Sequence, residues 1–172
     1  MDKLEEHGGV FFLNVDDPVI PSADQLDDAL VIEDVIFPGY PNRLFDRKNY
    51  LPIIRKGTTA TPIQVDYNGE PIFLISASVF PGSSGSPVFI HDAGFYYARS
   101  GMSYKGRLWF LGVLARFEYR EAPGWFEYKD SAVLEAKVAT QETLDLGIVF
   151  KDKAILATID HYLAMSGIQR GE

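Results

Sequence analysis

Short apolar segments recur along most of the chain, with turn-forming residues between them. Strands are predicted over 10–15, 30–37, 51–56, 59–65, 71–77, 87–90, 107–117 and 144–150. Asn68-Gly69 predicts a type I′ hairpin turn, because both residue types tolerate positive φ. Several strands at this close spacing predict a small barrel or a sandwich.

The period of the apolar positions changes near the C-terminus. From Asp152 onward they recur at helical spacing, at Ile155, Ile159, Tyr162 and Leu163. This pattern predicts an amphipathic helix of three or four turns that ends near Gly167.

The remaining segments give weaker signals. Ser22 and Gln25 form a capping-box pattern, which predicts one helical turn. Residues 119–143 show no clear period, so we interpret them as an insertion loop that can include a short helix. We interpret the acidic residues of 24–28 as a solvated linker face. The aromatic residues interpreted as core and barrel-mouth packing are Trp109, Phe110, Tyr119, Trp125 and Phe126.

The 172 residues suit one domain of ordinary size. We divide the chain into a tail, a remnant strand and a linker over 1–29, a barrel with its terminal helix over 30–167, and a tail over 168–172.

Composition excludes several classes of function. The net charge of -8 disfavours binding to nucleic acid or to anionic membranes. There is no apolar run long enough to span a membrane, and the acidic start shows no secretory signal. The chain has no Cys, which fits a reducing compartment and slightly favours the cytoplasm, although the location stays open. Three scattered His residues predict no metal site, and we expect no cofactor.

The most informative segment is Ser-Val-Phe-Pro-Gly-Ser-Ser-Gly-Ser-Pro-Val-Phe, over residues 78–89. It predicts a tight turn of small residues between two apolar strands. Such a turn can expose one hydroxyl and point successive N–H groups at one spot, as an oxyanion hole requires. Ser86 stands where an α/β-hydrolase elbow needs Gly, and the Lys of a phosphate-binding P-loop is missing.

Residues 82–87 resemble the Gly-x-Ser-Gly-Gly/Ser-Pro active-site signature of trypsin-like (chymotrypsin-fold) serine peptidases, in particular the bacterial glutamyl-endopeptidase and HtrA-like branch. Residues 35–41 resemble the Gly-Tyr-Pro segment that opens the second barrel of these enzymes. Residues 111–114 resemble the strand along the substrate cleft, and 146–149 resemble the ending before the terminal helix. The resemblance covers 10–163. It implies an all-β fold, a six-stranded antiparallel chymotrypsin-type barrel with a C-terminal α-helix, with the first barrel largely missing.

The resemblance also implies roles for individual residues. Ser84 would be the acylating nucleophile, and the N–H groups of Gly82 and Ser84 would form the oxyanion hole. Ser78 would lie near the base of the primary specificity pocket, and Leu114 and Ala115 would line it. An uncharged Ser78 does not support specificity for Arg or Lys. Residues 111–117 lack the His that the glutamyl-specific branch uses, so that specificity is also unsupported.

The general base is the missing part, because a serine hydroxyl is a poor nucleophile without one. In this family the His and Asp come from the first barrel, and the roughly thirty residues before Pro38-Gly39-Tyr40 are too few for six strands of about five to six residues each. The place of the catalytic Asp corresponds to about Gly9, and Asp16 and Asp17 follow the apolar run. We interpret His7, His91 and His161 as solvated or structural; only the first two have positions that could bring them near Ser84.

Three hypotheses remain open. The chain is a serine endopeptidase domain, incomplete or inactive because the catalytic His and Asp are missing; or a pseudopeptidase that binds a peptide or protein; or an unrelated barrel whose loop imitates the motif. The expected partner is a peptide or protein substrate, with a first-barrel segment or a second copy as further candidates, because a missing barrel would leave an apolar face exposed. Nucleic acid and membranes are not expected.

Overall fold

The computed structural model describes residues 19–124 and 138–168. In chain order the elements are α1 (Ala23–Asp28), β1 (Asp34–Gly39), η2 (Pro41–Arg43), β2 (Ile53–Thr59), η3 (Tyr67–Gly69), β3 (Ile72–Ser76), β4 (Pro87–Asp92), β5 (Tyr96–Ala98), β6 (Gly101–Ser103), β7 (Arg107–Gly124), β8 (Val138–Lys151) and α2 (Asp152–Ser166).

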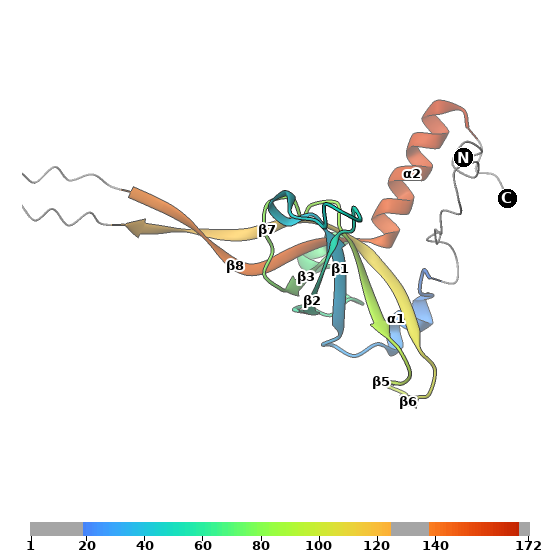
Figure 1. Ribbon diagram of the computed structural model, residues 1–172. Coiled ribbons are helices and arrows are strands. Elements are labelled where there is room, and N and C mark those ends of the chain that lie inside the picture. Colours follow the sequence, from blue (N-terminus) through green and yellow to red (C-terminus); the bar gives the residue numbers. More distant parts are fainter. Residues whose placement is uncertain (1–18, 125–137, 169–172) are drawn as a thin grey trace, which may run out of the picture.

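Six of the strands close into an antiparallel barrel, in the order β1-β2-β3-β8-β7-β4, with β1 pairing back to β4 (Figure 1). Strands β5 and β6 form a separate two-stranded hairpin between β4 and β7. The mostly β fold, the six-stranded antiparallel barrel and the C-terminal helix confirm the predicted architecture.

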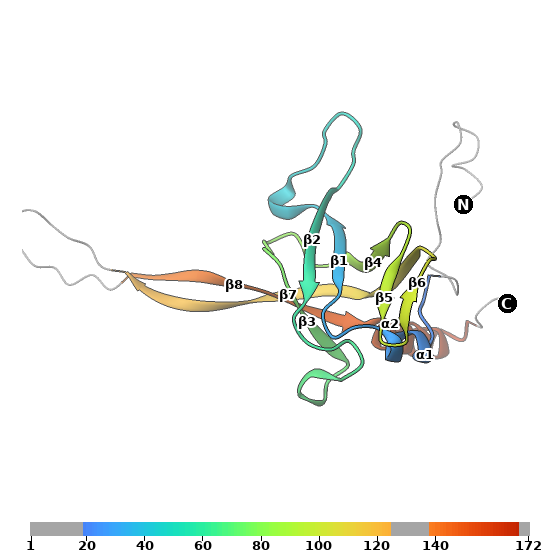
Figure 2. The same ribbon diagram turned by 90° about the horizontal axis from the view of Figure 1, so that it is seen from below.

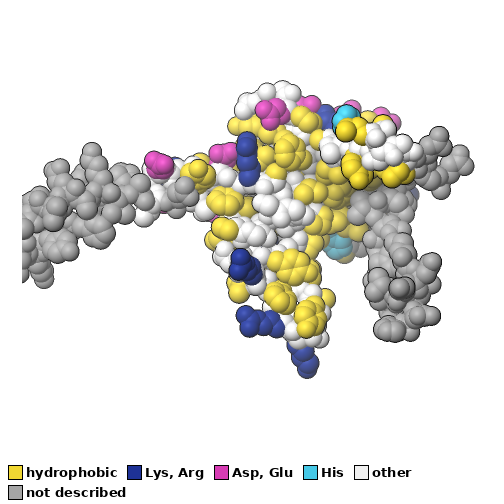
Figure 3. Space-filling model, turned by 90° about the horizontal axis from the view of Figure 1, so that it is seen from above, with side chains coloured by type: hydrophobic (Ala, Val, Ile, Leu, Met, Phe, Trp, Pro, Cys, Tyr) yellow, Lys and Arg dark blue, Asp and Glu magenta, His cyan; other side chains and the backbone are white. Residues whose placement is uncertain are grey.

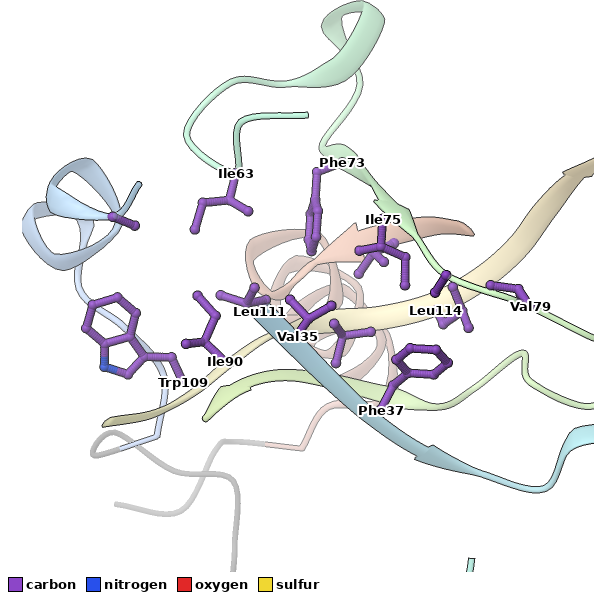
Figure 4. Close-up of a cluster of buried hydrophobic side chains, with 14 residues drawn as sticks. Val35, Phe37, Ile63, Phe73, Ile75, Val79, Ile90, Trp109, Leu111 and Leu114 are labelled. Atoms are coloured by element: carbon purple, nitrogen blue, oxygen red, sulfur yellow. The ribbon is translucent and has the colours of Figure 1, made fainter. Parts of the chain in front are cut away.

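The barrel interior is filled by alternate residues of its strands (Figure 4). On β1 the fully buried residues Val35 and Phe37 alternate with the half-buried residues Ile36 and Pro38, as period-2 alternation requires. Ile75 of β3 and Leu114 of β7 meet them inside. Each such side chain contributes about 1.5–3 kcal/mol by leaving water, so this cluster is the main source of the fold's stability.

The segment before β1 takes part in this core. Ser22 caps α1 through the predicted capping box with Gln25. Ala29, directly after the helix, is fully buried, and Leu26 packs against the same cluster. The Gln64 amide donates hydrogen bonds to the carbonyls of Leu26 (2.8 Å) and Ala29 (3.0 Å). Residues 23–29 therefore cover part of the barrel core.

Two predicted strand positions are wrong. The strand predicted over 30–37 begins only at Asp34, and residues 60–71, where we predicted a strand over 59–65, contain turns and η3. Pro62 cannot donate a ladder hydrogen bond, which disfavours a strand through this segment. Asn68 and Gly69 do have positive φ (55° and 77°). They lie in η3, inside the longer connection between β2 and β3, and so do not form the predicted two-residue hairpin turn.

The segment predicted as an insertion loop contains regular structure. Beyond the barrel, β7 and β8 continue as a paired two-stranded arm, from Tyr119↔Thr143 to Gly124↔Val138 (Figures 1 and 2). The prediction failed because the arm packs against no core and its sequence therefore lacks the usual alternation. Tyr119 is accordingly exposed, whereas the predicted burial of Trp109 and Phe110 is confirmed. Trp125 and Phe126 lie outside the described residues.

Helix α2 begins and ends where the pattern predicted, and Gly167 caps it in the left-handed conformation with φ of 65°. None of its residues is fully buried. Ile159 and Tyr162, which we assigned to the apolar face, are exposed, as is His161. Figure 1 shows the helix projecting from the end of β8. Neither described helix is both long and apolar enough to cross a membrane.

Candidate functional site: a serine turn on the barrel

The serine turn, residues 82–86 directly before β4, carries three serines, of which Ser83 and Ser86 are buried and Ser84 is exposed. Ser83 is fully buried, and its hydroxyl donates to the Phe80 carbonyl at 2.5 Å. The Ser83 N–H donates to the same carbonyl at 3.0 Å, and the Ser86 N–H donates to the Ser83 carbonyl at 3.1 Å. Ser83 thus holds the turn together, and its neighbour Ser84 is exposed.

Glycines at two positions allow this conformation. Gly82 and Gly85 have φ of 86° and 88°, in the region that L-residues rarely adopt. A Cβ at Gly82 would lie 2.7 Å from the Tyr40 carbonyl oxygen, and the Asn42 N–H donates to the Pro81 carbonyl at 2.7 Å. The serine turn therefore packs directly on the Gly-Tyr-Pro segment at the end of β1.

Ser84 is positioned by strand β7. Its hydroxyl donates to the Ala115 carbonyl at 2.7 Å. Ala115 lies at a bulge, because the pairing with β8 passes from Leu114↔Val149 to Arg116↔Ile148. A bulge removes a residue from the regular ladder, which is common beside active sites. This bulge leaves the Ala115 carbonyl free to accept from Ser84.

Two N–H groups of the turn have no partner among the described residues, those of Gly82 and Ser84. The N–H groups around them are used: Ser83 and Ser86 bond within the turn, and Gly85 donates to the Leu114 carbonyl at 2.8 Å. The two unpaired donors are those that the family resemblance assigns to an oxyanion hole. Such a hole requires N–H groups that are free in the resting protein.

The residues predicted for the substrate pocket have different surroundings. Ser78 is exposed and Ala115 is half-buried, so both lie at the surface near the turn. The Leu114 side chain is fully buried in the barrel core. Leu114 contributes its backbone instead, since its N–H donates to the Ser86 carbonyl at 2.9 Å.

Within the described chain, no histidine or carboxylate is hydrogen-bonded to the Ser84 hydroxyl. His91 is exposed on β4, four residues beyond Pro87, which is roughly 13 Å along a strand at about 3.3 Å per residue. His161 is exposed on α2. His7, Asp16 and Asp17 lie outside the described residues.

Arg55, on β2, is a neighbour of the turn that the sequence analysis missed. Its guanidinium lies over the Phe37 ring, 4.5 Å from the ring centroid. Its Nη1 atom donates to the Ser78 carbonyl at 3.3 Å, while Nε and Nη2 are buried without a hydrogen-bond partner in the described chain. Burial lowers the pKa of Arg55. The only sequence signal was a charged residue directly after the apolar pair Ile53-Ile54.

Among residues 19–124 and 138–168, no group of three or more His, Cys, Asp or Glu side chains could hold a metal ion. The chain matches no protein-family model, and no curated protein or solved structure proved similar to it. The site must therefore be interpreted from its own geometry.

Proposed function

We propose that this chain is the nucleophile-bearing barrel of a trypsin-like serine endopeptidase, in which a peptide substrate acylates Ser84. The observation that carries the proposal is an exposed hydroxyl on a glycine-shaped turn, adjacent to two N–H groups without partners in the described chain. The closed six-stranded barrel and the peptidase-like sequence of residues 82–87 support it.

The chemistry is acyl transfer. The Ser84 oxygen attacks the peptide carbonyl carbon while its proton passes to a general base, and the carbonyl oxygen becomes an oxyanion that accepts from the Gly82 and Ser84 N–H groups. The amine leaves with the proton, and water then hydrolyses the acyl ester. One such N–H donor is worth about 2.7–4 kcal/mol in the transition state.

The base must come within about 2.6–3.2 Å of the Ser84 oxygen. The hydroxyl would then exchange its bond to the Ala115 carbonyl for a bond to the base. Because neither described histidine bonds to Ser84, we expect the base to come from residues outside the described ranges or from another chain.

A second candidate function is peptide or protein binding without cleavage. The observation that favours it is the Ser84 hydroxyl itself, which donates to a backbone carbonyl and so carries no activating base. Exposed apolar side chains on the protrusion between β1 and β2 add a surface for a partner; Figure 3 shows hydrophobic and basic side chains together there. The exposed residues are Tyr40, Leu44, Tyr50 and Leu51 of this protrusion, together with Ile53 and Ile54 at the start of β2.

A fluorophosphonate probe separates the two functions, because it reacts only with an activated serine. For the peptidase we expect one adduct, located on Ser84 by mass spectrometry of the digested protein. Ser84→Ala should abolish it, whereas Ser76→Ala, at an exposed serine on β3, should leave it unchanged. An unlabelled protein that still binds peptides would instead establish the binding module. Labelling that persists in Ser84→Ala would contradict the role of Ser84.

A further inference from the structure

The connection between β1 and β2, residues 40–52, extends away from the barrel, as Figure 2 shows, and we call it the β1–β2 protrusion. Its exposed apolar side chains are Tyr40, Leu44, Tyr50 and Leu51, each between 47% and 74% exposed. Figure 3 shows hydrophobic and basic side chains next to one another in this part of the molecule. Single exposed apolar residues are ordinary, but a group of them on one projecting segment marks a surface that binds something.

Aromatic contacts and turn hydrogen bonds hold the protrusion in one shape. The ring centroid of Phe45 lies 6.0 Å from that of Tyr40 and 6.3 Å from that of Tyr50. The Asp46 N–H donates to the Leu51 carbonyl at 3.0 Å, and the Tyr50 N–H donates to the Asp46 carbonyl at 2.7 Å. The surface is therefore largely formed in advance, so that little conformational freedom is lost when it binds.

The protrusion also satisfies most of its own backbone donors. The N–H groups of residues 42–44, 46 and 48–50 all donate within the described chain. The Asp46 carboxylate accepts two of these bonds, from the N–H groups of Lys48 (2.9 Å) and Asn49 (3.1 Å). An N–H group without a partner is penalised when it leaves water. A segment with its donors paired in this way can enter a less polar environment with little penalty.

The charge of the protrusion is opposite to that of the chain. The chain has 24 acidic and 16 basic residues, but the protrusion has three cations, Arg43, Arg47 and Lys48, and one acid, Asp46. The three cations are exposed, and none of them forms an ion pair in the described chain. The net charge of -8, from which we expected no binding to anionic membranes, therefore conceals a local reversal of sign.

We propose that the β1–β2 protrusion docks this protein on the surface of an anionic lipid bilayer. The exposed Tyr and Leu side chains enter the interfacial layer, where Tyr is enriched in membrane proteins, and the three cations contact the anionic head groups. Lys and Arg can lay their apolar stems along such a layer while their charges stay in water. The inference is independent of the proposed function, because it does not involve Ser84.

Two features favour lipid over other partners. Leu44 and Leu51 have neither a ring to stack on a base nor a donor for a phosphate, whereas both can be buried among acyl chains. Lys is depleted from protein–protein interfaces, which disfavours a protein partner for a surface that includes Lys48. The acidic remainder of the chain does not prevent docking, because salt screens charges that lie more than about 8–10 Å from the bilayer.

The test measures how tightly the whole chain binds two kinds of lipid vesicle, by co-sedimentation. One kind is phosphatidylcholine alone, and the other also contains the anionic lipid phosphatidylglycerol. Each Lys or Arg near an anionic bilayer strengthens binding about fivefold, so we expect at least about tenfold tighter binding to the anionic vesicles. Added salt should weaken this preference, because it screens the charges of the bilayer surface.

Arg47→Gln combined with Lys48→Gln tests the charges. We expect this variant to bind the anionic vesicles about twentyfold more weakly, because two such cations are lost. The matched control is Lys105→Gln, at an exposed cation between β6 and β7, which should leave binding unchanged. A loss of the same size in Lys105→Gln would show that only the overall charge matters, and would overturn the inference.

Leu44→Ser combined with Leu51→Ser tests the apolar contact. It should weaken binding to the anionic vesicles at least about tenfold, since apolar side chains then no longer leave water. The matched control is Val31→Ser combined with Ile32→Ser, at two exposed apolar residues before β1, and it should bind normally. Unchanged binding in the Leu44 and Leu51 variant would contradict insertion of the protrusion.

Equal affinity for the two kinds of vesicle, or no binding to the anionic kind, overturns the inference. Binding of a single-stranded oligonucleotide or an acidic peptide through these residues, without vesicle binding, would assign the protrusion to another partner and also overturn it. Unchanged midpoints of urea denaturation show that the variants fold. Ser84→Ala should bind vesicles like the unaltered protein, so the fluorophosphonate test of the proposed function and this one succeed or fail separately.

Discussion

Two arginines of this barrel lie over aromatic rings, but only one of them has carboxylate partners in the described chain. Arg107, on β7, lies over the rings of Tyr96 (4.1 Å) and Trp109 (4.7 Å), and its guanidinium bonds to Glu33 at 2.5 Å and to Asp92 at 2.6 Å. Arg55 lies over one ring and has no carboxylate partner in the described chain.

The pKa values follow this difference. Burial lowers the pKa of Arg107, but the hydrogen bonds and charges of Glu33 and Asp92 outweigh it, so the pKa ends above its ordinary value. Burial alone acts on Arg55 and lowers its pKa. The positive charge of Arg107 is therefore neutralised by carboxylates of the chain itself, and this network stabilises the fold. Around Arg55, by contrast, the described residues supply no carboxylate, and two of its guanidinium nitrogens, Nε and Nη2, have no hydrogen-bond partner there.

Among the substitutions considered, replacement of Arg107 should cause the largest loss of stability. Arg107→Met leaves Glu33, itself buried, as an uncompensated charge, and we expect a loss of about 3–5 kcal/mol in the free energy of unfolding, measured by urea denaturation. The control is Arg120→Met, because Arg120 forms an exposed ion pair with Glu142, and such pairs contribute about 0–1 kcal/mol. Similar losses in the two variants would show that the buried network adds nothing special.

Substitutions of Gly82 and Gly85 test how rigidly the serine turn is held. Gly85→Ala meets no atom within 4 Å, so only its positive φ opposes the new side chain, at about 1–2 kcal/mol. Gly82→Ala has the same backbone penalty and also places its Cβ 2.7 Å from the Tyr40 carbonyl oxygen. We expect Gly82→Ala to destabilise more than Gly85→Ala in urea, and to reduce labelling of Ser84 more strongly. Equal losses would mean that the turn moves freely off the Gly-Tyr-Pro segment.

Sequence reasoning found the features whose signal is local. The capping box at Ser22, the αL cap at Gly167 and the glycine-serine turn each depend on residues within a few positions, and the structure has all three. It missed Arg55 because the contacts of this residue with Phe37 and Ser78 join three separate segments of the chain. The bulge at Ala115 was missed for the same reason, since only the pairing of β7 with β8 reveals it.

Replacement of Arg55 should cause the smallest change in stability. This result tests directly whether Arg55 and Arg107 have different roles. Arg55→Met keeps an unbranched side chain against Phe37, removes an unneutralised charge, and leaves one carbonyl, that of the exposed Ser78, which water can reach. The free energy of unfolding should change by less than about 1 kcal/mol, in either direction, because replacing a desolvated charge with an apolar group is often neutral or stabilising. Urea denaturation beside Arg107→Met makes the measurement. A loss comparable to that of Arg107→Met would show that Arg55 is a structural residue, and the two regions would then differ only in their partners.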